Sequence, residues 1–167
     1  MTNNSLAFIA LCNEFCSAAE NCLSMEPRAF IHDMLRLLPR IYISASDIEA
    51  DSLMDGYIDQ ALSEDNYEEI RRNLSVILGK YDTYLEAFEE DMKYSETPIG
   101  SSVSENLADL FQVFYNLLET VRDATEEVAE MALAAVKEDF CDYWGQTLCN
   151  VMRPLNNIYY KNTDFDD

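Results

Sequence analysis

The sequence predicts an all-α protein, a bundle of about five helices in one domain. Apolar residues recur at alternating spacings of three and four along most of the chain, the period of helices that pack through one face. The sequence shows no run of alternating β-branched residues between turn signals, so a sheet is not expected. With 167 residues, 49% of them apolar, the chain can bury a core without staples. We expect one helical domain over residues 1–161 and an acidic tail over residues 162–167.

The first two helices are expected over residues 5–23 and from Ser24 to about Ala45. Apolar side chains form a stripe on the first helix and cover most of the second, which places the second helix near the centre of the bundle. Ser24 is a candidate N-cap, because its hydroxyl can accept a hydrogen bond from a free backbone amide. Pro39 lies inside the second helix, where the missing amide and the bulky ring predict a kink.

The middle of the chain begins with an acidic stretch, residues 46–66, that we interpret as irregular with one short helix. Asn66 is the candidate cap of the third helix, whose apolar positions continue in steps of three and four to Phe88. Gly79 falls inside this pattern, where it permits close packing or a break. Residues 94–101, which contain a proline and a glycine, are predicted to form a loop.

Two capping signals mark the remaining helices. In each, a residue that can cap an amide is followed three positions later by glutamate: Ser102 with Glu105, and Asp123 with Glu126. The first signal starts a fourth helix that reaches about Ala124. Residues 128–159 then read as one long helix, or as two helices separated near Gly145 or Pro154.

The chain is strongly acidic, with 32 Asp and Glu against 11 Lys and Arg and a formal charge of -21. This charge opposes binding to phosphate backbones and anionic membranes, so neither nucleic acid nor a membrane is expected as a partner. It suits a basic protein surface, although net charge more often serves solubility. The apolar run from Leu6 to Cys12 lacks the basic start of a signal peptide, and charges interrupt the candidate membrane spans. We therefore expect a cytoplasmic protein.

Neither a metal, a cofactor nor a disulfide framework is predicted. The five cysteines lie on or beside apolar stripes, which favours buried, reduced thiols. His32 is the only histidine, so the paired Glu-x-x-His motifs of a di-iron bundle are absent. Residues 51–62 faintly resemble a calcium loop, but Leu53 and Leu62 stand where that loop has oxygen ligands. A zinc or redox role is the weaker alternative for Cys12, Cys16, Cys141 and Cys149.

A basic ridge on the second helix runs against the overall charge. Arg28, His32, Arg36 and Arg40 follow one another every four residues. Because an α-helix has about 3.6 residues per turn, the row winds by about 40° per step, and its ends need not share a ligand. We interpret the ridge as a polar face paired with nearby carboxylates, with ligand binding as the alternative.

Four short patterns span most of the chain. They are Leu37-Leu38-Pro39-Arg40-Ile41-Tyr42, Gly79-Lys80-Tyr81-Asp82-Thr83-Tyr84, Leu107-Ala108-Asp109-Leu110-Phe111 and Tyr143-Trp144-Gly145. In this order they resemble a bacterial family known as domain of unknown function 5063, which implies an all-helical fold and no named activity. The family pattern often has a second acid where Val113 stands and a histidine where Tyr143 stands, so this chain lacks two polar groups. The resemblance singles out Tyr42, Tyr81, Asp82, Tyr84, Asp109 and Trp144.

The leading hypothesis for function is a non-catalytic protein-interaction domain with an acidic surface. The sequence has no Gly-rich phosphate loop or Ser-centred elbow, and no support for a Cys-His pair, so no catalytic residue is assigned. Mimicry of nucleic acid toward a basic protein is a further reading of the same charge. The alternative is a pocket between helices for a small ligand or a substrate. Its aromatic walls would be Tyr42, Tyr81, Tyr84 and Trp144, and its polar handle Asp82 or Asp109.

The two aspartates each lie among large apolar neighbours. A carboxylate that is partly buried must accept hydrogen bonds that offset its lost hydration. We therefore expect at least one of Asp82 and Asp109 to be structural and bonded to Arg36, Arg40 or a tyrosine on a neighbouring helix.

Overall fold

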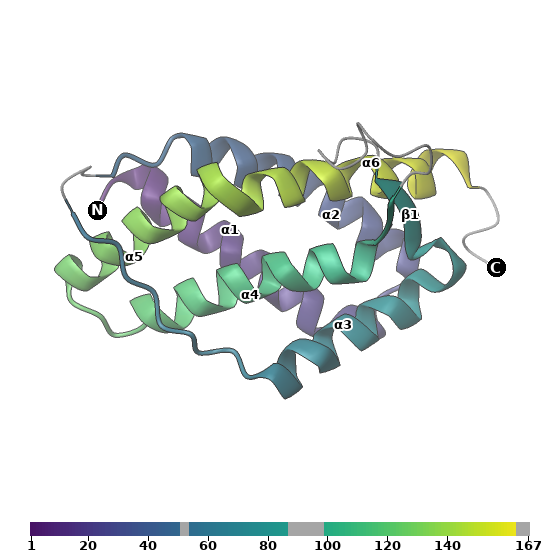
Figure 1. Cartoon of the computed structure of the whole chain (residues 1–167), viewed down its shortest axis with the longest axis horizontal. Helices are drawn as coiled ribbons and strands as arrows, with labels where there is room; N and C mark the ends of the chain where they lie inside the picture. Colours follow the sequence, from purple (N-terminus) through teal and green to yellow (C-terminus); the bar gives the residue numbers. More distant parts are fainter. Residues whose placement is uncertain (51–53, 87–98, 163–167) are drawn as a thin grey trace.

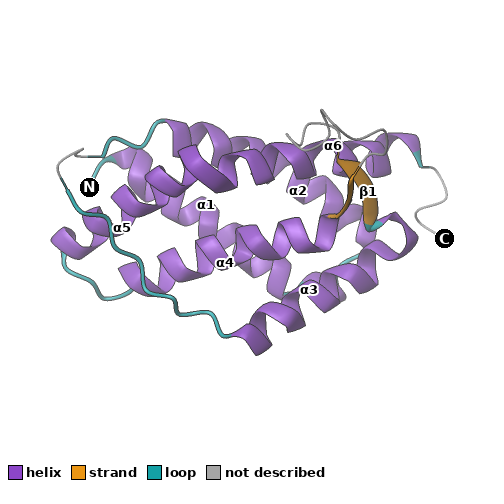
Figure 2. Ribbon diagram, viewed as in Figure 1, coloured by secondary structure: helices purple, strands orange, loops and turns teal. Residues whose placement is uncertain are grey.

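A computed structural model describes residues 1–50, 54–86 and 99–162 of the chain. Within these ranges the fold is all-α, as predicted, with one small two-stranded sheet (Figure 1, Figure 2). The α-helices are α1 Asn3–Glu20, α2 Pro27–Ser46, α3 Glu64–Leu78, α4 Val103–Val121, α5 Glu126–Asp139 and α6 Gly145–Lys161. Short 3₁₀ helices occupy Cys22–Ser24 and Gly79–Tyr81, and a π-helical segment occupies Phe140–Trp144.

Helix α4 forms the middle of the bundle. It packs against α1, α3, α5 and α6, while α2 packs against α1 and α6. Where these helices meet, Phe8 of α1 stacks on Trp144 with 6.2 Å between ring centroids. Phe114 of α4 makes edge contacts with both rings, at 6.5 and 5.2 Å. All three side chains are at most 2% exposed, and burying a side chain such as Phe contributes roughly 1.5–3 kcal/mol.

Hydroxyl side chains cap α3 and α4. Ser102 caps α4 as predicted, because its hydroxyl accepts a hydrogen bond from the Glu105 amide at 3.3 Å. The predicted cap of α3 was wrong. Ser63 caps this helix, since its hydroxyl accepts from the amide of Asn66 at 3.2 Å. Asn66 therefore lies in the first turn, where it is the capped residue rather than the cap.

The starts of α2 and α5 also differ from those predicted. Helix α2 begins at Pro27, whose missing amide is tolerated in a first turn, and Ser24 belongs to the preceding 3₁₀ helix. Thr125 caps α5 by accepting from the Val128 amide at 3.3 Å. Asp123 has a φ of 55°, which differs from the extended backbone of an N-cap, so it lies in the turn between α4 and α5.

The third helix is shorter than predicted, and a sheet follows it. Helix α3 ends at Leu78, because Gly79 adopts a φ of 55°, a left-handed conformation open to glycine. The chain then forms β1 Thr83–Glu86, which pairs antiparallel with β2 Ile99–Ser102. The predictions of a helix beyond Leu78 and of no sheet were therefore wrong, and Phe88 lies outside the described residues.

Three predicted features lie partly outside the described residues. Of the predicted loop 94–101, residues 99–101 belong to β2. The first residues of the calcium-like segment, 51–53, are not described, and neither are residues 163–167 of the predicted tail.

The acidic stretch crosses the front of the bundle as an extended segment (Figure 1). Its described residues, 47–50 and 54–63, form no helix, so the short helix predicted there is absent from this part. Asn116 and Thr120 of α4 hold the segment in place. The Asn116 side-chain oxygen accepts from two of its amides at 3.0 and 2.9 Å, and the Thr120 hydroxyl accepts from a third at 2.9 Å. These bonds satisfy backbone groups that a helix would otherwise satisfy.

The long C-terminal helix is interrupted next to Gly145, one of the two positions predicted. Helix α5 passes into the π-helical segment, and α6 starts at Gly145. A Cβ on Gly145 would lie 2.6 Å from the carbonyl oxygen of Phe140, so the close approach requires glycine. Pro154 lies inside α6 and does not divide it. Helix α2 is continuous through Pro39, and a kink there stays a prediction.

The described helices are not suited to a membrane-spanning position. In the described ranges, none is both long enough and apolar enough to cross a bilayer.

Candidate functional site

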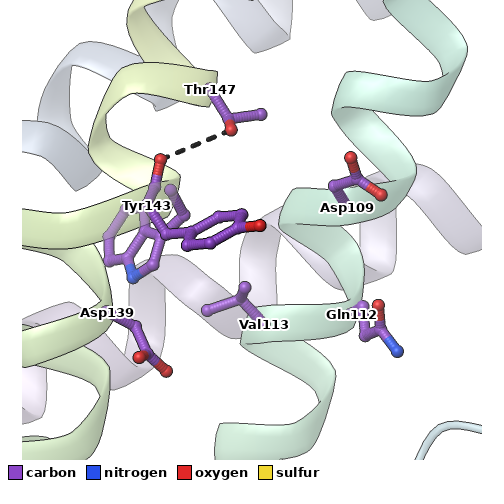
Figure 3. Close-up of a pocket in the computed structure, with 7 residues that line it drawn as sticks. Asp109, Gln112, Val113, Asp139, Tyr143 and Thr147 are labelled. Carbon is purple, nitrogen blue, oxygen red and sulfur yellow. Dashed lines mark hydrogen bonds between the residues drawn. The ribbon is translucent and has the colours of Figure 1, made fainter.

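A pocket of about 420 Å³ opens between α4 and the junction of α5 with α6 (Figure 3). We call it the α4–π pocket. Its lining combines two carboxyls, two aromatic rings, an amide, a hydroxyl and one aliphatic side chain: Asp109, Gln112, Val113, Asp139, Tyr143, Trp144 and Thr147. Pockets that hold small ligands span about 300–1,000 Å³, so this volume lies in their range. The lining is more polar than that of most such pockets, because Asp109, Gln112, Asp139 and Thr147 all contribute to it.

The π-helical segment supplies one wall of the α4–π pocket. A π turn holds more residues than an α turn, and such segments often occur at functional sites. Asp139 directly precedes this segment, and Tyr143 and Trp144 end it. In Figure 3 the Tyr143 ring extends from the segment toward α4, between Asp109 and Val113.

The two aromatic residues of the pocket differ in how they are held. Trp144 is 2% exposed, donates from Nε1 to the Val136 carbonyl oxygen at 3.0 Å and packs on Phe140 at 4.7 Å. Tyr143 is 77% exposed, and its backbone carbonyl accepts from the Thr147 hydroxyl at 3.5 Å. The pocket therefore has a fixed indole at its base and an exposed phenol at its mouth.

Helix α4 supplies the opposite wall. Asp109, Gln112 and Val113 are spaced by three and four residues, so they share one face of the helix. The Asp109 carboxylate accepts a hydrogen bond from the Tyr67 hydroxyl of α3 at 2.6 Å. A tyrosine of a neighbouring helix thus bonds one of the two aspartates, as predicted.

Both pocket carboxyls are harder to ionise than usual. Lost hydration raises the pKa of Asp109, and the bond from Tyr67 partly opposes this rise. Lost hydration also raises the pKa of Asp139, and the neighbouring charge of Asp142 adds to it. Burial and the bond to Asp109 raise the pKa of Tyr67. The described lining includes no Lys, Arg or His that would offset the two negative charges.

Of the eight residues predicted for a site, the structure brings Asp109 and Trp144 together in the α4–π pocket. Tyr42 lies on α2 and packs edge-on against Phe140 at 5.1 Å, outside the described lining of this pocket. Tyr42 is 40% exposed. Phe140 separates it from Trp144, so the two aromatic residues do not form one wall.

Asp82 has a structural environment at the start of α4. Its carboxylate accepts from the Ser104 amide and the Ser104 hydroxyl, both at 2.7 Å, and from the Ser102 hydroxyl at 3.1 Å. Its own carbonyl accepts from the Val103 amide at 2.8 Å. These bonds fasten the β1–β2 hairpin to the first turn of α4, where the helix dipole also favours a negative charge.

Tyr81 and Tyr84 accompany Asp82 near the hairpin rather than the pocket. Both are half-buried against the core. The Lys80 ammonium lies 5.1 Å from the Tyr81 ring centroid, and Asn106 of α4 donates to the Tyr84 hydroxyl. A single pocket that unites these tyrosines with Tyr42 and Trp144 is therefore not formed.

Arg36 and Arg40 line a separate groove between α1 and α2, the α1–α2 groove, of about 280 Å³. The prediction that the basic ridge pairs with carboxylates was wrong for these two arginines. Neither forms an ion pair with a carboxylate in the described ranges, and neither bonds Asp82 or Asp109. Both arginines are exposed to solvent instead. Elsewhere on the ridge, Arg28 lies 4.2 Å from the Tyr159 ring centroid, and His32 lies 3.6 Å from Asp33.

Sequence reasoning missed Asp139, Gln112 and Thr147 as pocket residues. Val113 and Tyr143 were noted only as departures from the family pattern, yet both line the pocket beside Asp109. The third and fourth family patterns therefore meet at one place. Their convergence was the available signal for the site.

The described residues contain no cluster that supports metal binding. In residues 1–50, 54–86 and 99–162, no group of three or more His, Cys, Asp or Glu side chains is arranged to hold an ion. The α4–π pocket itself offers two carboxylates, with Gln112 and Thr147 as further oxygen donors.

Comparison with known proteins gives matches over nearly the whole chain. A family model described as domain of unknown function (DUF5063) matches residues 1–161. The structure is similar to the crystal structure of protein BF1032 from Bacteroides fragilis, with a TM-score of 0.82 and 28% sequence identity. That match covers 98% of this chain and 96% of the other. No curated protein matches. The four patterns and the family match agree, and the chain belongs to the family of domain of unknown function 5063.

Proposed function

We propose that this chain is a non-catalytic binding domain that receives a protonated amine in the α4–π pocket. The observation that carries the proposal is the pairing of two carboxyls, Asp109 and Asp139, with an exposed aromatic ring and no basic residue in the described lining. Both aspartates are exposed, and a cation bound beside them would offset their two negative charges. Opposite charges at close range favour each other by more in a partly desolvated pocket than in water.

The aromatic lining favours an organic cation over a bare ion. The ring faces of tyrosine and tryptophan attract ammonium groups, by about 0.5–2 kcal/mol according to solvent exposure. Tyr143 presents such a ring at the pocket mouth, and Trp144 forms the base. Gln112 and Thr147 add hydrogen-bond acceptors for the remaining ammonium protons.

Binding without chemistry is the simpler proposal for this lining. Among the described pocket residues, the one small hydroxyl, Thr147, is directed at the carbonyl of Tyr143 rather than at a base. A nucleophile needs such a base within hydrogen-bond reach. The formal charge of -21 would also attract cations from a distance.

The amine has two sources, a free small molecule or a lysine side chain of a basic protein. Both present the same group to the pocket. The charge of the whole surface would add to the affinity for a basic protein, because more contacts form outside the pocket. The surface charge would add less to the affinity for a small molecule, because its single charge contacts only the pocket lining.

Isothermal titration calorimetry with matched ligands tests the proposal. Benzylamine carries the cation and a ring, whereas benzyl alcohol has the same shape without the charge. We expect benzylamine to bind and benzyl alcohol to bind at least about tenfold more weakly, a difference of about 1.4 kcal/mol. A short lysine-glycine peptide identifies the source, since it should bind more tightly than benzylamine if the natural ligand is a protein.

Variants locate the binding. Replacing Asp109 and Asp139 together by Asn should weaken benzylamine binding by at least about tenfold. The matched control replaces Asp55 and Asp65, two exposed acids outside the pocket, by Asn. Equal binding of benzylamine and benzyl alcohol, or equal loss in both double variants, would overturn the proposal.

A further inference from the structure

The negative charge of the chain is unevenly distributed. Residues 1–46, which contain α1 and α2, hold four acidic and three basic residues, a net charge of -1. Of the total of -21, residues 47–167 therefore carry -20. The α1–α2 pair is thus nearly neutral in a strongly acidic molecule, and it lies on the side of the bundle away from the viewer in Figure 1.

The outer surface of α1 is unusually free of charge. Its 18 residues include two charged ones, Glu14 and Glu20, whereas 26% of the whole chain is charged. Leu6 is 54% exposed, and the neighbouring exposed positions are mostly small or amide side chains. A surface helix normally turns a charged face to water. This face is therefore less costly to remove from water than the rest of the surface.

Helix α2 contributes charges of both signs beside this face. Arg36 and Arg40 line the α1–α2 groove together with Glu14 and Asp33. The two arginines form no ion pair with a described carboxylate of their own chain. Ile43 follows in the same row of α2 and is 61% exposed.

The two helices run antiparallel, so the apolar positions gather at one end. The Asn4 side chain of α1 donates to the Ser44 carbonyl of α2 at 2.9 Å. The start of α1 therefore lies beside the end of α2, and exposed Leu6 and Ile43 belong to the same end of the pair. The groove with its four charges lies further along.

We infer that this α1–α2 face docks a second copy of the chain in a two-fold dimer. Arg36 and Arg40 of each copy meet Glu14 and Asp33 of the other, and the exposed apolar residues at the end of the face are covered. In a two-fold contact every such pair occurs twice, so a face with both signs of charge is complementary to itself. Arginine suits this contact because its planar group binds a carboxylate with two parallel hydrogen bonds.

A second copy fits the face better than other partners do. An acidic partner would be repelled by Glu14 and Asp33, and a basic partner by Arg36 and Arg40. The dimer also joins the two molecules through their least acidic parts. The strongly negative surfaces then lie outside the contact, and salt screens charges over about 8 Å at physiological ionic strength.

Sedimentation velocity over a hundredfold range of concentration, about 1 to 100 μM, tests the inference. We expect the wild-type chain to sediment as a dimer at the upper end. Replacing Arg36 and Arg40 by Glu should leave a folded monomer, since four carboxylates of each copy would then face four of the other. The matched control replaces the exposed Arg72 and Arg153 by Glu, which changes the net charge equally and should leave the dimer intact.

Charge exchange makes the test specific to the proposed pairs. A second variant, with Glu14 and Asp33 both replaced by Lys, should also be monomeric. An equimolar mixture of the Glu variant and the Lys variant should dimerise, because each contact again joins opposite charges. Circular dichroism checks that all variants are folded. A monomeric wild-type chain, a dimer that survives the Arg36 and Arg40 replacements, or a mixture of folded variants that stays monomeric would overturn the inference.

Discussion

The Tyr67 hydroxyl donates a 2.6 Å hydrogen bond to the Asp109 carboxylate, and this bond joins α3 to the helix that walls the α4–π pocket. Tyr67 is the partner that keeps the pKa of Asp109 from rising further. The same residue thus has a structural role toward α3 and an electrostatic role toward the pocket. Its removal should affect both.

Replacing Tyr67 by Phe tests this coupling. We expect the pKa of Asp109 to rise, since the donor that favours its charged form is lost, and the stability to fall by roughly 1 kcal/mol. Carboxyl carbon chemical shifts measured against pH report the pKa directly. Tyr57→Phe is the matched control, because this exposed phenol bonds Asp59 and neither residue lines the pocket. An unchanged pKa of Asp109 would contradict the role assigned to Tyr67.

The Asp82 cluster should contribute to stability rather than to binding. Replacing Asp82 by Asn removes the charge that accepts from Ser102 and Ser104, at nearly unchanged volume. We expect the free energy of unfolding to fall by about 1.5–3 kcal/mol, the range for hydrogen bonds to a charged group. Urea denaturation measures this change, with the exposed Asp55→Asn as control. A variant that unfolds like the parent would show that the carboxylate does not fasten the hairpin.

Replacing Asp139 should have the opposite effect on stability at neutral pH. Its pKa in the folded chain is raised above the ordinary 3.8, so the cost in stability begins as the pH rises above the unfolded pKa and is complete above the folded pKa. Below the unfolded pKa both states are protonated and the cost disappears. Asp139→Asn should therefore stabilise the chain at about pH 7, by less than about 1 kcal/mol because water screens the carboxyl. Denaturation curves that show a gain growing toward acidic pH would contradict this sign.

The cysteines should divide into two groups toward a thiol reagent. Cys12, Cys16 and Cys22 are at most 3% exposed, and burial raises the pKa of each of these thiols. Cys141 and Cys149 are exposed, so the prediction of buried thiols was wrong for these two residues. Labelling under native conditions should therefore modify the last two quickly and the first three only on unfolding. Peptide mass spectrometry after a short pulse identifies the modified residues, and rapid labelling of Cys12 would contradict the packing of α1.

Local patterns predicted helices well where the signal for each boundary was also local. The cap of α4 at Ser102 is an example, since its partner amide lies three residues away. The end of α3 was missed although the apolar period correctly marked Tyr81 and Tyr84 as positions that contact the core. They reach the core from a 3₁₀ turn and a strand, because the backbone of Gly79 turns the chain.

The candidate site was predictable only where a motif happened to include its residues. Asp109 and Trp144 belong to family patterns and line the pocket. No sequence motif marks Asp139. It faces the α4 wall of the pocket only because the helices pack together in the fold. Beside Asp139, the π-helical segment includes the close approach of Gly145 to Phe140. The spacing of apolar residues does not predict this contact.

The most direct measurement of the proposed function uses Trp144, the one tryptophan of the chain, as a probe within the pocket. Benzylamine is titrated while the tryptophan emission is recorded, with benzyl alcohol as the uncharged control. The proposal predicts a saturable change with benzylamine that is much weaker with benzyl alcohol and is lost when Asp109 and Asp139 are both replaced by Asn. An emission that stays constant with benzylamine, or that changes equally with the alcohol, would contradict an amine-binding pocket.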